Sequence, residues 1–371
     1  MKSLTEHKYN FIFAGGGTGG HLYPLIAVAE QVKKNLPDSE ILFVGTAHKI
    51  ESKVVPALGY NFKSINISGF PRTINLESVK FIFKLLYSLF QSFFICIKFK
   101  PDVAIGSGAY VSGPIIWAAK LVGAKVVLLE QNSYPGVTNR ILEKKADKIH
   151  ISFGDSKKYF RNIEKLFLTG NPLRINVNLM PKEEAANLFG LSNGKKTIVV
   201  LGGSLGAKTI NYSIEKNINE FKKLELQIIW QCGEKYYEDL KKYNDQAIKV
   251  VAFVENMGQL YSAADLVIAR AGATTIAELA YLGVPTIFIP SPNVTDDHQY
   301  KNAKSIEDLG GAIVIKDNEA AEGLIDLVRS TIFDIDKLNL LKEKIKYFAK
   351  PDAAKIIGCD IIEMAKNRNR L

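Results

Sequence analysis

A short run of consecutive hydrophobic residues at positions 11–14 leads into the glycine-rich segment 15–20. Apolar residues then recur at three- and four-residue steps, the period of a helix with one buried face. Pro24 is compatible with the first turn of this helix, because the N–H that proline lacks would be unpaired there. The pattern predicts a strand, a tight turn and a helix that together approach a ligand, most simply an anion. His21 stands at the mouth of that turn.

The same loop fits the fingerprint of dinucleotide-binding proteins, with Gly15, Gly17 and Gly20 at the required spacing. That fingerprint also includes an acidic residue after the second strand, where it binds a ribose diol. The second predicted strand, residues 41–44, is followed by glycine and threonine instead. A nicotinamide or flavin enzyme is therefore disfavoured.

Further hydrophobic runs at 103–105 and 126–129 alternate with predicted helices, which is typical of a doubly wound parallel sheet. A second glycine loop, residues 106–114, follows the first of these runs, and residues 130–132 (Glu-Gln-Asn) follow the second. Ligands bind at the carboxyl ends of the strands in such sheets. We expect the three loops of this half to point at one crevice.

The second half repeats the plan of the first. A strand at 197–201 leads into the glycine loop 202–207 and a helix, and more strands are predicted at 227–230, 249–253, 266–269 and 286–289. The fold class expected is α/β, with two Rossmann-like doubly wound parallel-sheet domains facing across a cleft. We expect domains at 1–172 and 173–351, and a C-terminal helix, 352–371, that packs back on the first domain.

Residues 79–100 form an unusual segment in which lysines flank a stretch dense in Phe, Leu and Ile. The uncharged part between Lys84 and Lys98 is shorter than the ~20 residues that span a bilayer. As a helix it is apolar nearly all round. It is either a core helix or a membrane-surface helix, with its lysines at the headgroups and its aromatic side chains at the acyl chains.

Composition narrows the function classes only slightly. At 371 residues the chain is long enough for two domains, and its 48 Lys and Arg against 38 Asp and Glu give a net charge of +10. This positive excess is compatible with an anionic partner, which could be nucleic acid, a phosphorylated metabolite or an anionic membrane. The alternative is a basic surface with no specialised role. The three cysteines lack metal-ligand spacing, which indicates a reducing compartment, and no signal peptide is expected.

The segment 265–280 carries the most informative chemistry. A strand ends at Arg270, and a helix begins near Thr274 or Thr275, where N–H groups and hydroxyls could hold a diphosphate. Glu278 lies one turn further on, where its carboxylate could accept both hydroxyls of a ribose. The alternative is a capping box formed by Thr275 and Glu278, which needs no ligand. The nearby loop 290–299 carries groups that could bind sugar hydroxyls.

Taken together, these stretches resemble the bacterial glycosyltransferases that add N-acetylglucosamine to undecaprenyl-pyrophosphoryl-N-acetylmuramoyl-pentapeptide, a peptidoglycan precursor. The matching stretches occur in the family's order and span most of the chain: residues 15–24, 106–114, 130–132 with 139–140, 170–174, 202–207, 270–278 and 297–303. The resemblance implies a GT-B fold that requires no cofactor and no metal.

The resemblance also assigns residues to the two substrates. The UDP-N-acetylglucosamine donor would be bound by Thr18, Gly19, Gly20, Asn132, Arg174, Ser204, Val254, Ala273, Thr274, Thr275, Ile276, Ala277, Glu278 and Gln299. The acceptor pyrophosphate would lie against Gly16, Gly17, Gly106, Ser107, Gly108, Tyr110 and Gly113.

The implied reaction is an inverting transfer to the acceptor's 4-hydroxyl, with UDP as the leaving group. His21 is the candidate base, because an imidazole can be neutral near pH 7. The alternative is that His21 caps its helix or bonds to phosphate. Some members of the family carry histidine before the glutamate at position 130, whereas this chain has Leu129.

The expected partners are UDP-N-acetylglucosamine, the undecaprenyl-linked muramoyl-pentapeptide and an anionic membrane surface, with other cell-wall enzymes left open and nucleic acid not expected. The expected location is the cytoplasmic face of the cell membrane, as a peripheral protein. The alternatives are another GT-B glycosyltransferase, UDP-N-acetylglucosamine 2-epimerase, or a non-catalytic subunit that binds a nucleotide sugar.

Overall fold

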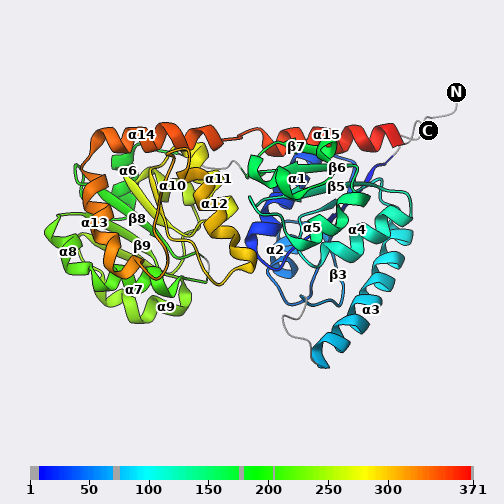
Figure 1. The fold of residues 1–371 in the computed structure, drawn as a ribbon, viewed down its shortest axis with the longest axis horizontal. Helices are drawn as coiled ribbons and strands as arrows, with labels where there is room; N and C mark the ends of the chain where they lie inside the picture. Colours follow the sequence, from blue (N-terminus) through cyan, green and yellow to red (C-terminus); the bar gives the residue numbers. More distant parts are fainter. Residues whose placement is uncertain (1–7, 70–75, 175–178, 204, 369–371) are drawn as a thin grey trace. The chain divides into compact units, whose positions relative to one another are not determined.

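The computed structural model describes residues 8–69, 76–174, 179–203 and 205–368. The chain divides into two compact units, which are described separately (Figure 1). The first unit consists of Met1–Arg174 together with Lys350–Leu371, and the second of Ile175–Ala349. The first boundary lies two residues after the position expected from the sequence.

The first unit is built on a parallel sheet of seven strands in the order β3-β2-β1-β4-β5-β6-β7. Its central strands are buried on both faces, which explains why they appear in the sequence as continuous hydrophobic runs. Because β1 has β2 on one side and β4 on the other, the order reverses there, and the loops after β1 and β4 are neighbours at the carboxyl edge. The strands are β1 (Asn10–Ala14), β2 (Glu40–Gly45), β3 (Asn61–Ser64), β4 (Val103–Gly106), β5 (Lys125–Glu130), β6 (Lys148–Ile151) and β7 (Leu166–Leu168).

The helices of the first unit lie on both faces of this sheet (Figure 1). They are α1 (Gly19–Asn35), α2 (Glu51–Ala57), α3 (Leu76–Phe99), α4 (Ser112–Leu121), α5 (Val137–Leu142) and α15 (Ala353–Arg368), with short 3-10 turns η1 (Glu143–Lys145), η2 (Gly154–Tyr159) and η3 (Ile163–Lys165).

The C-terminal helix α15 packs against α1 in this first unit. Gly358 allows the close approach, since a Cβ there would lie 2.8 Å from Cβ of Gln31. Asp360 adds polar contacts by pairing with Lys148 and with buried His150, whose Nε2 lies 3.1 Å from the carboxylate. The end of the chain therefore contributes to the N-terminal core.

The second unit is a parallel sheet of six strands in the order β10-β9-β8-β11-β12-β13, with β8 at the reversal point. The strands are β8 (Thr197–Leu201), β9 (Gln227–Gln231), β10 (Ile248–Val251), β11 (Leu266–Ala269), β12 (Thr286–Phe288) and β13 (Ile313–Val314). The helices are α6 (Lys182–Leu188), α7 (Lys208–Lys216), α8 (Ile218–Lys223), α9 (Glu234–Leu240), α10 (Met257–Ser262), α11 (Ala273–Leu282), α12 (His298–Glu307), α13 (Ala320–Ile332) and α14 (Ile335–Ile345), with 3-10 turns η4 (Lys241–Tyr243), η5 (Thr295–Asp297) and η6 (Lys346–Phe348). The predicted α/β class with two parallel-sheet units is confirmed.

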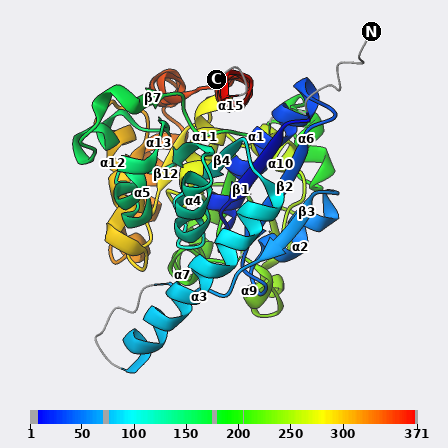
Figure 2. The ribbon, with the colours of Figure 1, turned by 90° about the vertical axis from the view of Figure 1, so that its right-hand side faces the viewer.

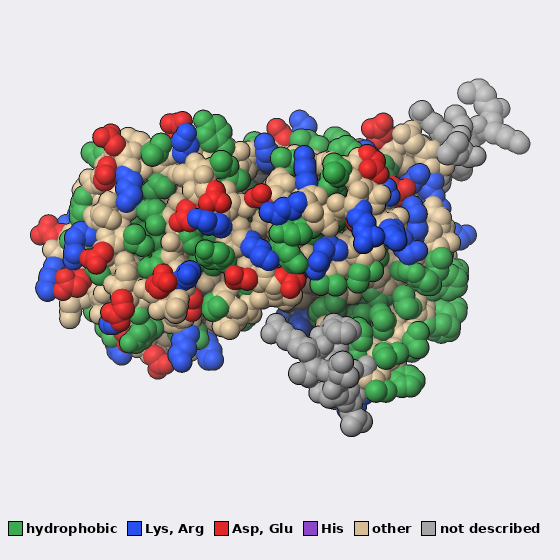
Figure 3. Space-filling model, viewed as in Figure 1, with side chains coloured by type: hydrophobic (Ala, Val, Ile, Leu, Met, Phe, Trp, Pro, Cys, Tyr) green, Lys and Arg blue, Asp and Glu red, His purple; other side chains and the backbone are tan. Residues whose placement is uncertain are grey.

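Helix α3 runs beside α4 on the surface of the first unit (Figure 2). Ser88, Ser92 and Cys96 recur every four residues and are fully buried, and the Cys96 Sγ lies 3.9 Å from the carbonyl oxygen of Ile115 on α4. The large apolar side chains are exposed instead, with Phe83 at 68% and Phe90 at 61%, and they form the hydrophobic patch seen over α3 in Figure 3. The core-helix interpretation is wrong, because the buried stripe of α3 is made of its small residues.

Candidate functional site

The side chain of Glu51 supports the first glycine loop, residues 15–20. This carboxylate is buried, and no sequence motif identifies it. Its oxygens accept hydrogen bonds from the N–H of Gly17 (2.8 Å) and from the N–H and hydroxyl of Thr46 (2.9 and 2.7 Å). A Cβ at Gly16 would lie 2.3 Å from the Glu51 carboxyl carbon, so this glycine makes room for the carboxylate. Gly17 has φ +84° and open space on its other side, where a ligand can approach the backbone.

His21 connects the first glycine loop to the second. It lies in the first turn of α1, after the N-cap Thr18, and its Nδ1 is 2.7 Å from the carbonyl oxygen of Ser107. A carbonyl oxygen can only accept, so Nδ1 carries the proton of the neutral ring and Nε2 keeps the lone pair. The ring therefore bonds to the neighbouring loop through one nitrogen and has its basic nitrogen on the opposite side.

The two glycine loops of the first unit are pressed together. A Cβ at Gly15 would lie 2.0 Å from the Ser107 hydroxyl of the second loop. The second loop also packs on α5, since a Cβ at Gly108 would lie 2.7 Å from the side-chain nitrogen of Asn139. Tyr110 belongs to the same cluster, because its hydroxyl bonds to Thr46, and burial and the nearby Glu51 raise its pKa. The structure therefore brings the predicted acceptor residues of the two loops to one edge of the sheet: Gly16, Gly17, Gly106, Ser107, Gly108, Tyr110 and Gly113.

Glu130 shapes the third loop, which carries Asn132. The Glu130 side chain is 2% exposed and accepts hydrogen bonds from the N–H groups of Asn132 and Gly136 (both 3.0 Å) and from the side chain of Asn139 (2.9 Å). Burial raises the pKa of this carboxyl, and the hydrogen bonds oppose that shift. Its position at the end of β5 was evident from the sequence, whereas its supporting role needed the structure.

The glycine loop of the second unit follows β8 and is supported by backbone rather than by a carboxylate. A Cβ at Gly206 would lie 2.3 Å from the carbonyl oxygen of Cys232, so this glycine allows two loops to pack directly together. Gly203 has φ +76°, and a Cβ there would meet nothing within 4 Å, which leaves its backbone accessible to a ligand. The predicted donor residue Ser204 lies outside the described residues.

A pocket of about 120 Å³ opens beside this loop at the carboxyl edge of the second sheet. Glu278 lines it together with two other predicted donor residues, Val254 and Thr275. The Glu278 carboxylate accepts a hydrogen bond of 2.8 Å from the Tyr261 hydroxyl, and burial raises its pKa to about 7. The capping-box interpretation is wrong, because the N-cap of α11 is Gly272 and Thr275 lies inside the helix.

The remaining predicted residues of α11 form its first two turns. Ala273 and Ile276 are buried, while Thr274 and Ala277 are partly accessible, so the helix offers backbone and hydroxyl groups at this end of the sheet. Arg270 precedes the helix and is engaged with protein groups: it pairs with Asp317 and donates to the carbonyl oxygen of Ile289 (2.9 Å).

Gln299 lies at the start of α12, after a strained turn. Asp296 and Asp297 both take the left-handed conformation, with φ of +55° and +52°, which is uncommon outside glycine and clusters at functional sites. The Gln299 side-chain oxygen accepts from the N–H of Ser291 (2.9 Å), and His298 Nδ1 lies 2.8 Å from the carbonyl oxygen of Thr295. These bonds hold the turn in shape.

Arg174 is not grouped with the donor residues of the second unit. It belongs to the first unit, where its guanidinium pairs with Glu30 of α1 at 2.7 Å. Thr18, Gly19, Gly20 and Asn132 also lie in the first unit. The predicted donor residues are therefore divided between two sheets.

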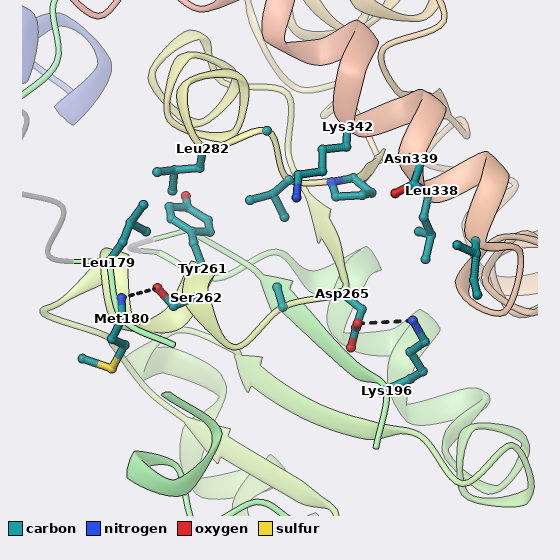
Figure 4. A pocket seen from close by; sticks show the side chains of 15 residues that line it. Leu179, Met180, Lys196, Tyr261, Ser262, Asp265, Leu282, Leu338, Asn339 and Lys342 are labelled. Atoms are coloured by element: carbon teal, nitrogen blue, oxygen red, sulfur yellow. Dashed lines mark hydrogen bonds and ion pairs between the residues drawn. The ribbon is translucent and has the colours of Figure 1, made fainter. Parts of the chain in front are cut away.

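A larger cavity in the second unit, about 380 Å³, lies at the opposite end of the sheet, beside the starts of β8, β11 and β12 (Figure 4). It contains none of the predicted site residues. Asp265 and Lys196 pair across it at 3.4 Å, and Tyr261 contributes to both this cavity and the smaller pocket. Within the described residues, no group of His, Cys, Asp or Glu is arranged to hold a metal ion.

Comparison with known proteins identifies both units. Residues 11–151 match the Glycosyltransferase family 28 N-terminal domain, and residues 197–357 match the Glycosyltransferase family 28 C-terminal domain. Together these matches cover well over half of the chain.

Two bacterial proteins are similar over nearly the full length. A protein of Flavobacterium psychrophilum is 44% identical, with 97% of this chain and 99% of that protein covered, and one of Cytophaga hutchinsonii is 42% identical, with 97% and 98% covered. Both are named UDP-N-acetylglucosamine--N-acetylmuramyl-(pentapeptide) pyrophosphoryl-undecaprenol N-acetylglucosamine transferase.

Solved structures agree on the fold. The crystal structure of Acinetobacter baumannii MurG matches with a TM-score of 0.77 and 28% identity, covering 96% of this chain and 99% of that one. A UDP-N-acetylglucosamine 2-epimerase matches with a TM-score of 0.61 and 13% identity, covering 94% of each chain, which is a likeness of fold alone.

Proposed function

The chain belongs to glycosyltransferase family 28, and from this premise we propose that it transfers N-acetylglucosamine from UDP-N-acetylglucosamine to the 4-hydroxyl of undecaprenyl-linked N-acetylmuramoyl-pentapeptide. The observation that carries the proposal is the similarity, along nearly the whole chain, to relatives named for this transfer. The product is the lipid-linked disaccharide precursor of peptidoglycan.

The donor would bind mainly to the second unit. Gly203 offers an open backbone to the diphosphate, and the N-terminus of α11 adds N–H groups and a favourable dipole. Glu278 would accept the ribose hydroxyls, and Gln299 the hydroxyls of the sugar. Val254 would contact the uracil. Arg174 would contribute to diphosphate binding only if it exchanged Glu30 for the phosphate.

The acceptor would bind to the first unit, with its pyrophosphate against the paired glycine loops. The N–H of Gly17 already donates a hydrogen bond to Glu51. The pyrophosphate would therefore be bound by the other N–H groups of the loops and by the N-terminus of α1. Asn132, whose N–H donates to the Glu130 carboxylate, is the residue of this loop that the family resemblance assigns to the donor.

The chemical step is a displacement at the anomeric carbon of the donor. The acceptor 4-hydroxyl forms the new bond to this carbon as the bond to the UDP oxygen breaks, so the configuration inverts. His21 Nε2 would take the hydroxyl proton, because Nδ1 is already protonated and held by Ser107. UDP leaves with the electron pair of the broken bond. A non-catalytic subunit would not need a histidine in this tautomer.

Membrane association would depend on α3. The stretch Val79–Phe99 is long and apolar enough to cross a bilayer by length and composition alone, with 17% of its most apolar part buried. One side of α3 is packed on α4, however, so only its outer face is available to lipid. We therefore propose a peripheral protein whose α3 lies on the anionic cytoplasmic face of the membrane, with exposed Lys84 and Lys98 at the headgroups.

The transfer is tested with the full chain, UDP-N-acetylglucosamine and lipid-linked muramoyl-pentapeptide in detergent. UDP should be released in equal amount to the disaccharide product, and omission of the lipid acceptor should stop the release. If UDP-N-acetylmannosamine or free sugar formed instead, without disaccharide, the epimerase or a hydrolase would replace the proposed activity.

The membrane proposal is tested by vesicle sedimentation. Replacing Phe83 and Phe90 together with Ser should reduce binding to vesicles containing anionic phospholipid by about tenfold or more, because two largely exposed aromatic side chains are lost from the lipid-facing surface. Phe333→Ser, a change of an exposed phenylalanine in the second unit, is the matched control and should leave binding unchanged. Equal binding by the double variant and the control would contradict a lipid contact for α3.

A further inference from the structure

Glu278 has an unusual environment for a group that accepts two hydroxyl hydrogen bonds. It lies in a pocket with the apolar side chains of Leu201, Phe253 and Met257, and the loss of water raises its pKa to about 7. At neutral pH such a carboxyl is about half protonated, and a protonated carboxyl has fewer acceptor sites for a ribose diol. Something must therefore favour its charged form.

The Tyr261 hydroxyl is the hydrogen-bond donor that the structure provides. It lies 2.8 Å from Glu278 Oε2, and the ring is 3% exposed. Burial and the neighbouring carboxyl raise the pKa of Tyr261 well above its usual value, so the phenol keeps its proton and the direction of the bond is fixed. A hydrogen bond donated to a carboxylate favours the ionised form.

Tyr261 is itself firmly held. It lies in α10, whose N-cap Asn256 accepts hydrogen bonds from the N–H groups of Gly258 (3.1 Å) and Gln259 (3.3 Å). On its other side, the ring forms part of the wall of the larger cavity (Figure 4). The ring therefore separates the two cavities and presents its hydroxyl to Glu278.

Other charges in the pocket do not replace this bond. Among the described residues that line the smaller pocket, Arg270 is the one further charged group, and its guanidinium is paired with Asp317. The pKa of Glu278 is lowered by the Tyr261 hydrogen bond against the larger effect of burial. The hydrogen-bonded pair of Tyr261 in α10 and Glu278 in α11 therefore lies wholly within the second unit.

We infer that Tyr261 is a positioning residue for donor recognition, whose hydroxyl fixes the Glu278 carboxyl and favours its charged form for the ribose diol. The inference rests on the proposed function, because it takes Glu278 as the group that binds the ribose. Tyr261 touches no substrate in this scheme and acts through the carboxylate alone.

The test is the affinity of UDP-N-acetylglucosamine for the full chain, measured by calorimetry between pH 6 and 8.5 without acceptor. The sugar diphosphate is esterified at both ends, so its charge is constant over most of this range. If Tyr261→Phe raises the pKa of Glu278 by about one unit, the ionised fraction at pH 7 falls from about one half to about one tenth, and affinity falls about fivefold. At pH 8.5 the expected difference is less than about 1.5-fold.

Two controls separate this inference from the proposed function. Tyr347→Phe, at an exposed tyrosine of the second unit, should match the parent at every pH. The 2′-deoxyribose analogue of the donor should bind with a smaller difference between parent and Tyr261→Phe, because it presents only one hydroxyl to the carboxylate.

The outcomes are distinguishable. If Glu278→Gln binds the donor as well as the parent, and the parent shows no loss of affinity below pH 7, the ribose assignment itself fails. If that loss is present but the Tyr261→Phe profile coincides with the parent's, or is weaker by the same factor at all pH values, the role of Tyr261 is overturned. Carbon-13 NMR titration of the Glu278 carboxyl in the ligand-free protein gives a second measurement, in which an unchanged pKa in the folded variant contradicts the inference.

Discussion

The two units use glutamates beside equivalent glycine loops in opposite ways. In the first unit, Glu51 accepts three hydrogen bonds from Gly17 and Thr46 and is 1% exposed. In the second unit, Glu278 lines a pocket, and the hydrogen bond that lowers its pKa comes from the Tyr261 hydroxyl. The first carboxylate is used to build a loop, whereas the second retains acceptor sites for a ligand.

The same strand–glycine loop–helix plan therefore supports two tasks. A carboxylate whose oxygens accept hydrogen bonds from the loop around it has its acceptor sites occupied and becomes part of the scaffold. A carboxylate that accepts one hydrogen bond in an apolar pocket has a pKa near neutrality. Its charged form is stabilised further by a ligand whose hydroxyl groups donate hydrogen bonds to it. We therefore expect changes around the first loop to affect the chemical step or the fold, and changes in the second pocket to affect donor affinity.

The largest effect is expected at His21. His21→Ala removes the proposed base and should lower kcat about 10²- to 10⁴-fold, with little change in the KM for the donor, measured as UDP release under saturating acceptor. His48→Ala, at an exposed histidine of the same unit, is the matched control and should retain parental kcat. Near-parental turnover of His21→Ala would remove the base assignment.

The next effect is expected at Glu51. Glu51→Ala leaves the N–H groups of Gly17 and Thr46 without their acceptor, so it should reduce the free energy of unfolding by about 2–4 kcal/mol, measured by denaturant unfolding. Glu164→Ala, at an exposed position of the same unit, should change it by less than about 0.5 kcal/mol. Equal stability of the two variants would show that Glu51 is not a support of the loop.

A smaller effect on binding, without loss of stability, is expected at Glu278. Glu278→Gln should weaken donor binding about 10- to 100-fold, as measured by calorimetry at pH 8, because it removes a charged acceptor of hydroxyl hydrogen bonds. A pKa raised to about 7 means that the folded protein binds more protons than the unfolded chain between roughly pH 4.5 and 7, so this group makes stability fall as pH rises across that window.

The glutamine variant should lack this part of the pH dependence and be at least as stable as the parent at pH 8. A clear loss of stability together with unchanged donor affinity would reverse the comparison, because Glu278 would then be a scaffold residue like Glu51.

Much of the fold could be predicted because it depends on local pattern. The runs at 197–201 and 266–269 are strands with the predicted bounds, since a strand buried on both faces must be apolar throughout. The short outer strands β3 and β13 were not predicted, because β3 has one apolar residue among its four and β13 has only two residues. The orientation of the helix in segment 79–100 could not be predicted for a similar reason, because composition does not determine which side of a helix packs against its neighbours.

The two strand–glycine loop–helix units could be predicted from the sequence, because turn chemistry and hydrophobic period are properties of neighbouring residues. The family was indicated by the resemblance of a set of motifs in their order along the chain. The sequence also drew attention to His21 and Glu278. The partners of these residues and of the first glycine loop depend on tertiary contacts between distant positions: Ser107 is 86 residues from His21, Glu51 is 34 residues from Gly17, and Tyr261 is 17 residues from Glu278. The order of strands in each sheet brings these residues into contact. The resulting burial and hydrogen bonds determine whether each carboxylate supports a loop or remains available to a ligand.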